Sequence, residues 1–137
     1  MNSKKKGNKI FVRIDRGEEV IKNLKEIRDF YDIQNGFFYG IGAVDKVKLG
    51  HYDVEKQDYK EKEFTKPFEV TNFTGNIGHD KIHAHITVAD GKFNVRGGHC
   101  SFARVSGTFE IVIDLTEGIP LNHKRDKETG LDIMDFR

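Results

Sequence analysis

Short runs of alternating apolar and polar residues fill most of the chain, and a single early segment shows helical spacing. In residues 9–15, Ile10, Val12 and Ile14 share one side, as they would in a half-buried strand. From residue 36 onward, further strand-like runs follow one another and are separated by Gly, Asp-Gly or Asn-Gly. This pattern predicts six or seven antiparallel strands.

Residues 17–33 carry the helical segment. Val20, Leu24 and Ile27 fall on one stripe of a helix, with polar residues on the opposite side. Asp15 and Glu18 form the pattern of an N-cap with a capping box, which predicts that the helix opens directly after Asp15. The sequence Gln-Asn-Gly at residues 34–36 is typical of a C-terminal stop.

One helix and several antiparallel strands predict a single α+β domain over residues 1–137, with a strongly curved, barrel-like sheet. Residues 1–8 are rich in Lys and have no apolar partner, so we expect a flexible tail. Residues 131–136 form a small apolar cluster after a polar stretch. We expect this cluster to dock on the same chain or on a neighbouring one.

Charge and cysteine content exclude several classes of protein. The chain has 23 basic and 22 acidic residues and a net charge of +1, which creates no field that attracts nucleic acid or membranes. Cys100 is the only cysteine, so neither an intrachain disulfide nor a cysteine-based zinc site is expected. The sequence contains no apolar run of membrane-spanning length and no signal peptide, which predicts a soluble, cytoplasmic protein.

The stretch KIHAHITVADGKFNVRGGHC holds three of the six histidines. His83 and His85 alternate with apolar residues, so they share the face of a strand opposite the core. Asp90-Gly91 is typical of a two-residue hairpin turn. Counting back from such a turn places His99 on the wrong face. A β-bulge at residues 97–98, where two glycines stand, would return it to the side of His83.

Three imidazoles on one face can hold a single divalent ion at nitrogen–zinc distances of about 2.0–2.1 Å. His83, His85 and His99 are therefore the predicted ligands of zinc or another divalent metal ion. Three protein ligands leave a coordination position open, which is more typical of catalytic sites than of structural ones. The alternative is that these are exposed histidines that share a strand by chance.

The remaining polar candidates have simpler interpretations. His79 is a possible accessory ligand, but its position in a loop favours an exposed side chain, and we expect His51 and His123 at the surface. Arg96 and Arg104 are candidates for orienting an anionic ligand, with surface ion pairs as the alternative. The small side chain of Cys100 is expected to be buried.

The segments GEEVIKNLKEI, FYGIGAVDKVKLGHYD, FEVTNFTGNIG and HAHITVADGKFNVRGGH occur in the order of the plants-and-prokaryotes-conserved (PPC) domain. The chain resembles the stand-alone prokaryotic form of this domain over nearly its whole length. The resemblance implies an α+β fold with a curved antiparallel sheet, and a homotrimer. It also implies a distant structural kinship with acetolactate decarboxylase, a zinc enzyme whose H-x-H plus His arrangement falls here on His83, His85 and His99.

Two classes of function stay open. The first is a metal site that binds or acts on a small anionic metabolite, with the metal as Lewis acid or water activator. The second is a non-enzymatic PPC module for self-association and for binding to DNA or proteins. Prokaryotic members are often labelled DNA-binding, but the Arg-Gly-Arg-Pro motif credited with DNA contact in plant members is missing from this sequence. We therefore expect any DNA binding to be weak and non-specific.

Overall fold

The computed structural model describes residues 1–136, which form one helix and eight strands. The elements are β1 (Asn2–Lys6), β2 (Lys9–Ile14), α1 (Val20–Phe30), β3 (Asn35–Asp53), β4 (Asp58–Gly78), β5 (Ile82–Ala89), β6 (Val95–Leu115), β7 (Asn122–Arg125) and β8 (Asp132–Asp135). One helix near the N-terminus and a majority of antiparallel strands confirm the predicted α+β class.

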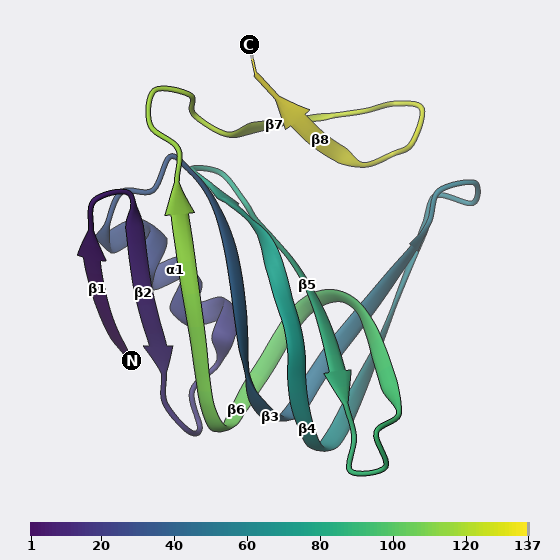
Figure 1. Ribbon diagram of the computed structural model, residues 1–137. Helices are drawn as coiled ribbons and strands as arrows, with labels where there is room; N and C mark the ends of the chain where they lie inside the picture. Colours follow the sequence, from purple (N-terminus) through teal and green to yellow (C-terminus); the bar gives the residue numbers. More distant parts are fainter. Residues whose placement is uncertain (137) are drawn as a thin grey trace.

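Six strands form one sheet in the order β1-β2-β6-β3-β4-β5, and all of its pairings are antiparallel. β5 also pairs with β6, so β3, β4, β5 and β6 close into a ring. Figure 1 shows the resulting strong curvature of the sheet. The expected barrel-like sheet is therefore present, with β1 and β2 extending it on one side.

The strands are longer than the sequence runs indicate. The strand β4 continues for 21 residues. In the same way, β6 continues for 21 residues from the histidine region to the strands of the N-terminal half. Irregularities in β3 between Gly40 and Gly42 and between Val44 and Lys46 accompany this bending.

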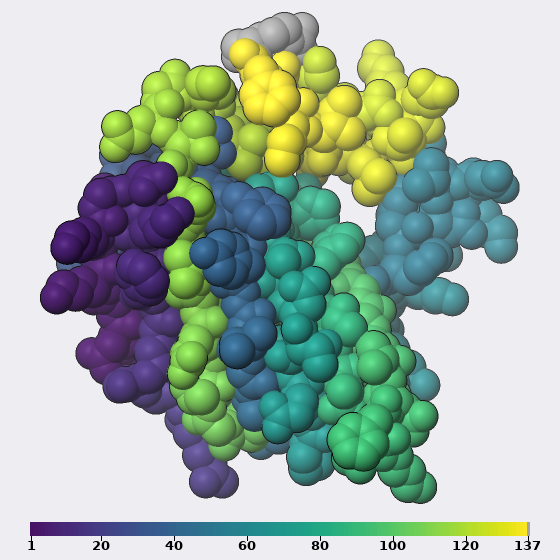
Figure 2. Space-filling model, viewed as in Figure 1, coloured from purple at the N-terminus to yellow at the C-terminus, as the bar shows by residue number. Residues whose placement is uncertain are grey.

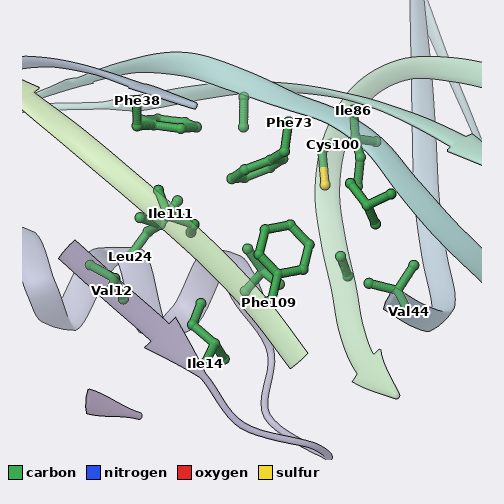
Figure 3. Packing of buried hydrophobic residues seen from close by; sticks show 14 of the residues in the cluster. Val12, Ile14, Leu24, Phe38, Val44, Phe73, Ile86, Cys100, Phe109 and Ile111 are labelled. Carbon is green, nitrogen blue, oxygen red and sulfur yellow. The ribbon is translucent and has the colours of Figure 1, made fainter. Parts of the chain in front are cut away.

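Apolar side chains from β2, α1 and the ring strands meet in one core (Figure 3). The ring of Phe73 lies 5.1 Å, between centroids, from both Phe38 and Phe109. Leu24 and Ile27 of α1 are buried in the same cluster, as the helical stripe predicts. Cys100 is also buried there, which confirms its expected place.

The helix begins and ends at other residues than the sequence pattern suggests. Its N-cap is Glu19, whose carboxylate accepts hydrogen bonds from the backbone N–H groups of Ile21 (2.9 Å) and Lys22 (2.6 Å). The expected cap, Asp15, instead closes a turn with Glu18 before the helix begins. At the other end, the left-handed conformation of Asp32 (φ 50°) stops the helix ahead of the Gln-Asn-Gly sequence.

The N-terminal segment was expected to be a flexible tail, but residues 2–6 form the edge strand β1. β1 pairs with β2 from Asn2–Arg13 to Lys6–Lys9. Its side chains are all exposed, so the hydrophobic pattern carries no trace of it. Backbone hydrogen bonding to an adjacent strand is enough to order such a polar segment.

The C-terminal residues form a separate two-stranded sheet, β7–β8. Figure 2 shows this hairpin, in yellow, lying across one end of the molecule above a hollow. Leu121, at its base, is buried, and the backbone N–H of Leu121 donates to the carbonyl of Gln34 at 2.9 Å. The apolar cluster at residues 131–136, which was expected to dock, stays partly exposed, and Leu131, Ile133 and Met134 line a cavity together with residues of the chain's own sheet.

None of the described residues form a helix with the length and apolar character needed to cross a lipid bilayer.

Candidate metal centre

β5 places two histidines on the face that points away from the core. Ala84, Ile86 and Val88 alternate with them and are buried, at exposures between 0% and 2%. His83 and His85 therefore project from the opposite face, as the alternation predicts. Both lie at the start of the strand, below the C-terminal hairpin.

His99 reaches the same face, but by a different route from the one predicted. It lies opposite His85 in the β5–β6 ladder, which continues through Ile86–Gly98 and Thr87–Gly97 without a register shift. The expected two-residue turn and the bulge at Gly97-Gly98 are both wrong. The turn is wider, because the last pair of the ladder is Ala89–Val95.

Asp90 widens the turn. Its carboxylate accepts hydrogen bonds from the backbone N–H groups of Lys92 (2.9 Å) and Asn94 (3.1 Å), and Phe93 adopts a left-handed conformation with φ 64°. In the observed pairing, each residue of β5 lies opposite a residue of β6 that is three positions later than the two-residue turn predicts. Because three is odd, every side chain at the start of β6 changes face, and His99 joins the other histidines without a bulge.

The three rings converge closely enough for one ion. The Nε2 atoms of His83 and His85 are 3.2 Å apart, and the ligand nitrogens of all three histidines lie within 4.8 Å of one another. Two nitrogens bound tetrahedrally to zinc at about 2.05 Å lie roughly 3.3 Å apart. The first pair thus already has the required spacing, and the His99 nitrogen lies within 4.8 Å of both.

The surroundings keep two of the three imidazoles neutral. Burial, followed by the charges of His85 and His99, lowers the pKa of His83 from 6.5 to about 4. Burial, with a further effect of His85, also lowers the pKa of His99. A neutral imidazole offers the lone pair that a metal ion requires, so protons compete weakly for these two rings at neutral pH.

Tyr59 of β4 packs against His99, and no pattern in the sequence indicates this role. The two rings meet edge to face with centroids 6.1 Å apart. The Tyr59 hydroxyl donates to the Glu61 carboxylate at 2.8 Å, and that carboxylate also accepts from Ser101 at 2.7 Å. Burial and the Glu61 hydrogen bond raise the pKa of Tyr59 to about 12, which keeps this hydroxyl a donor.

Glycine makes room for this arrangement. A Cβ at Gly50 would overlap the Tyr59 hydroxyl, so only glycine lets the ring lie against this part of β3. A Cβ at Gly98 would lie 2.6 Å from the carbonyl oxygen of Gly50. The glycine before His99 therefore serves the close approach of β3 and β6 instead of a bulge.

The histidines open into a cavity of about 710 Å³. Its lining also includes Lys81 and Asn76, and the Oδ1 atom of Asn76 is buried with no hydrogen-bond partner among the described residues. The C-terminal hairpin contributes a wall of the cavity. Volumes of this size are usual for sites that bind small molecules.

The other three histidines differ in their exposure to solvent. His51 lines the cavity and is exposed, whereas His79 is exposed and outside the cluster. His123, expected at the surface, has a side chain only 6% exposed and contacts Asp80, with Nδ1 and Oδ1 3.1 Å apart. Because His123 is far from the other histidines in the sequence, no local pattern indicates that its side chain is buried beside Asp80.

Neither Arg96 nor Arg104 lines the cavity. The Nε atom of Arg104 donates to Asp45 at 2.7 Å, which is the surface ion pair given as the alternative. The guanidinium of Arg96 lies over the ring of Phe64, 4.7 Å from its centroid. Lys81 is the cation that lines the cavity.

Comparison with known proteins identifies the family. Residues 1–116 match the model of the Plants and Prokaryotes Conserved (PCC) domain. The chain belongs to the PCC domain family, also written PPC. No curated protein matches it significantly in sequence.

Two solved structures share nearly the whole fold. A "putative DNA-binding protein" of Bacteroides thetaiotaomicron is 29% identical with a TM-score of 0.92, and the match covers 98% of this chain and 96% of that one. A metal-containing protein of Archaeoglobus fulgidus is 30% identical with a TM-score of 0.84, covering 93% of each chain.

The chain also has a more distant structural similarity to an enzyme. Acetolactate decarboxylase of Bacillus subtilis is 16% identical with a TM-score of 0.55, and the match covers 77% of this chain and 51% of the decarboxylase. At this level of identity, the likeness shows a shared fold alone. The kinship implied by the sequence motifs is thus present at the level of structure.

Proposed function

We propose that this PCC domain binds one zinc ion per chain through His83, His85 and His99, and that the cavity beside the ion takes a small anionic molecule. The convergence of three imidazoles at the cavity carries the proposal. Imidazole suits zinc among the divalent metals of cells, although it also binds copper, nickel and iron. The metal-containing relative from Archaeoglobus supports it further.

The open coordination position defines the chemistry. A zinc ion held by three imidazoles supplies a Lewis acid that polarises a bound oxygen or activates water. The residues of the chain hold and surround that position: Tyr59 packs against His99, and Lys81 lines the cavity, where it pairs with Asp132. An anionic oxygen donor is the ligand that such a pocket favours.

Metal titration of the full chain tests the site. Chelator-stripped protein is titrated with zinc and analysed by calorimetry and elemental analysis, and we expect about one ion per chain. His83→Ala and His99→Ala should each weaken zinc binding by about a hundredfold or more. His79→Ala is the matched control, because His79 is an exposed histidine outside the cluster. Equal zinc affinity in all these variants would refute the proposal.

We also propose that the protein assembles as a homotrimer. The number three follows from the family resemblance, and an apolar outer face of the sheet supports self-association. Phe11, Tyr39 and Ile41 are 51%, 47% and 58% exposed and line one groove of about 680 Å³ with Val112. Large exposed apolar patches of this kind are typical of protein interfaces.

Light scattering on the purified protein tests the assembly. We expect three times the chain mass at micromolar concentration, and a lower mass for Ile41→Lys because the charge interrupts the apolar face. Val95→Lys is the control, since Val95 is 63% exposed but does not line this groove. A monomer mass for the unmodified protein would exclude the assembly.

The name of the Bacteroides relative raises DNA binding as an alternative. The Lys-rich segment that carries Lys4, Lys5 and Lys6 is an exposed edge strand, but the net charge of the chain is only +1. We therefore expect weak binding without sequence preference, which a titration against unrelated duplexes at physiological salt would detect. Tight, sequence-selective binding would contradict this expectation.

A further inference from the structure

The C-terminal hairpin, residues 121–135, lies beyond the residues that match the family model, yet it helps to enclose the histidine cavity. Five of its side chains line the cavity: His123, Leu131, Asp132, Ile133 and Met134. The histidines come from the closed ring of strands, whereas this wall comes from a separate two-stranded sheet. The hairpin is therefore placed to determine which molecules fit beside the metal.

Polar contacts hold the hairpin over the cavity. At its tip, the Tyr52 hydroxyl donates to the carbonyl of Thr129 at 2.8 Å and Gln57 Nε2 donates to that of Glu128 at 3.1 Å. Along β8, Asp132 pairs with Lys81 at 3.1 Å. These contacts join the hairpin to β3, to the β3–β4 turn and to Lys81, whereas Leu131, Ile133 and Met134 are not part of the core.

The apolar side chains of the hairpin remain partly exposed beside the cavity. Leu131, Ile133 and Met134 are 37%, 40% and 44% exposed, and Val54, which lines the cavity from the β3–β4 turn, is 46% exposed. Apolar surface of this kind gains free energy when it is covered. An aliphatic group of a ligand would cover it.

The charges of the cavity favour an anion. Lys81 and Asp132 both line the cavity, and they form an ion pair with each other. Imidazole ligands carry no negative charge, so the two positive charges of a bound zinc ion would stay uncompensated. A carboxylate supplies that charge and an oxygen donor together.

We propose that the cavity binds a small monocarboxylate with a short aliphatic chain, and that Ile133 and Met134 of the hairpin select for the chain. The carboxylate occupies the metal position next to Lys81, and the aliphatic part lies against the hairpin. This proposal rests on the zinc site proposed above.

Binding of acetate, butyrate and butylammonium to the zinc-loaded full chain, measured by calorimetry, tests it. Butyrate has two more CH₂ groups than acetate, and each buried CH₂ group strengthens binding about fourfold, so butyrate should bind about fifteenfold more tightly than acetate. Butylammonium should not bind, because it carries the wrong charge. In Ile133→Ser and Met134→Ser, the preference for butyrate should shrink to about threefold or less, with zinc and acetate affinity unchanged.

Ile119→Ser is the matched control, since Ile119 is 50% exposed and lies outside this cavity. The substituted side chains are all partly exposed, so the variants should fold. Equal affinity for acetate and butyrate, or a butyrate preference that survives both hairpin substitutions, would overturn the inference and leave the zinc site standing. Failure to bind zinc would overturn both.

Discussion

The two faces of β5 show how one strand serves a core and a site at the same time. On one face, Ala84, Ile86 and Val88 are at most 2% exposed and pack in the apolar core. On the other, His83 and His85 meet with their Nε2 atoms 3.2 Å apart. The same ladders to β4 and β6 fix both faces, so the histidines take their spacing from a backbone that the core holds in place.

A single charge placed on either face gives the largest contrast. Ile86→Asp buries a carboxylate among apolar residues without a partner, and we expect it to cost about 5 kcal/mol or more, enough to prevent folding. His85→Asp, one residue away, faces the cavity and should change the free energy of unfolding by less than about 1 kcal/mol. Circular dichroism and urea unfolding measure both. Equal stability of the two variants would show that the faces do not differ.

Acid should affect the histidine face of β5 but not its core face, which carries no titrating side chain. The pKa of His83 is lowered from 6.5 to about 4 by folding, so below pH 6.5 the unfolded chain takes up a proton that the folded chain refuses. Stability of the metal-free protein should therefore fall between pH 6.5 and 4. We expect a loss of about 1–2 kcal/mol, since the ring is only half buried and solvent screens part of the effect.

Urea unfolding at a series of pH values checks this, with His83→Gln as the variant that should flatten the dependence. Ile86→Val is the control, because it weakens the core face by about 1 kcal/mol without adding or removing a titrating group. A pH dependence that His83→Gln leaves unchanged would assign the effect to other groups.

The smallest effect is expected at Cys100, which directly follows His99 but faces the core. Burial raises the pKa of its thiol to about 12, so the reactive thiolate is scarce at pH 8. Iodoacetamide should leave the folded protein unmodified and should label it in urea, as mass spectrometry would show. Rapid labelling of the folded chain would mean that the core face is open beside the site.

Much of the fold could be predicted from periodicity, because alternation and helical spacing record which residues the core covers. The stripe of Val20, Leu24 and Ile27 and the alternation around His83 and His85 both reappear in the structure. β1 escaped prediction because its stability comes from backbone pairing with β2 and not from apolar side chains.

The sequence correctly predicted that the three histidines of the candidate site come together, but it predicted the wrong backbone geometry for His99. Alternation correctly placed His83 and His85, but His99 arrives through a wide turn that the Asp90 carboxylate organises, not through a bulge. Asp-Gly is common in both tight and wide turns, so the dipeptide alone could not decide the register. The wall built by the C-terminal hairpin depends on distant contacts such as Tyr52 with Thr129, which local sequence does not encode.

The order of strands along the chain also governs when the site can form during synthesis. His83, His85 and His99 come together through the β5–β6 hairpin, a local pairing whose turn spans residues 90–94. The β2–β6 pairing joins Lys9 to Asp114, which are 105 residues apart, and such distant pairings form slowly. A ribosome-bound chain that has emerged just past Cys100 already carries all three imidazoles. A metal ion can therefore meet them before residues 109–114, which complete the sheet against β2, have emerged from the ribosome.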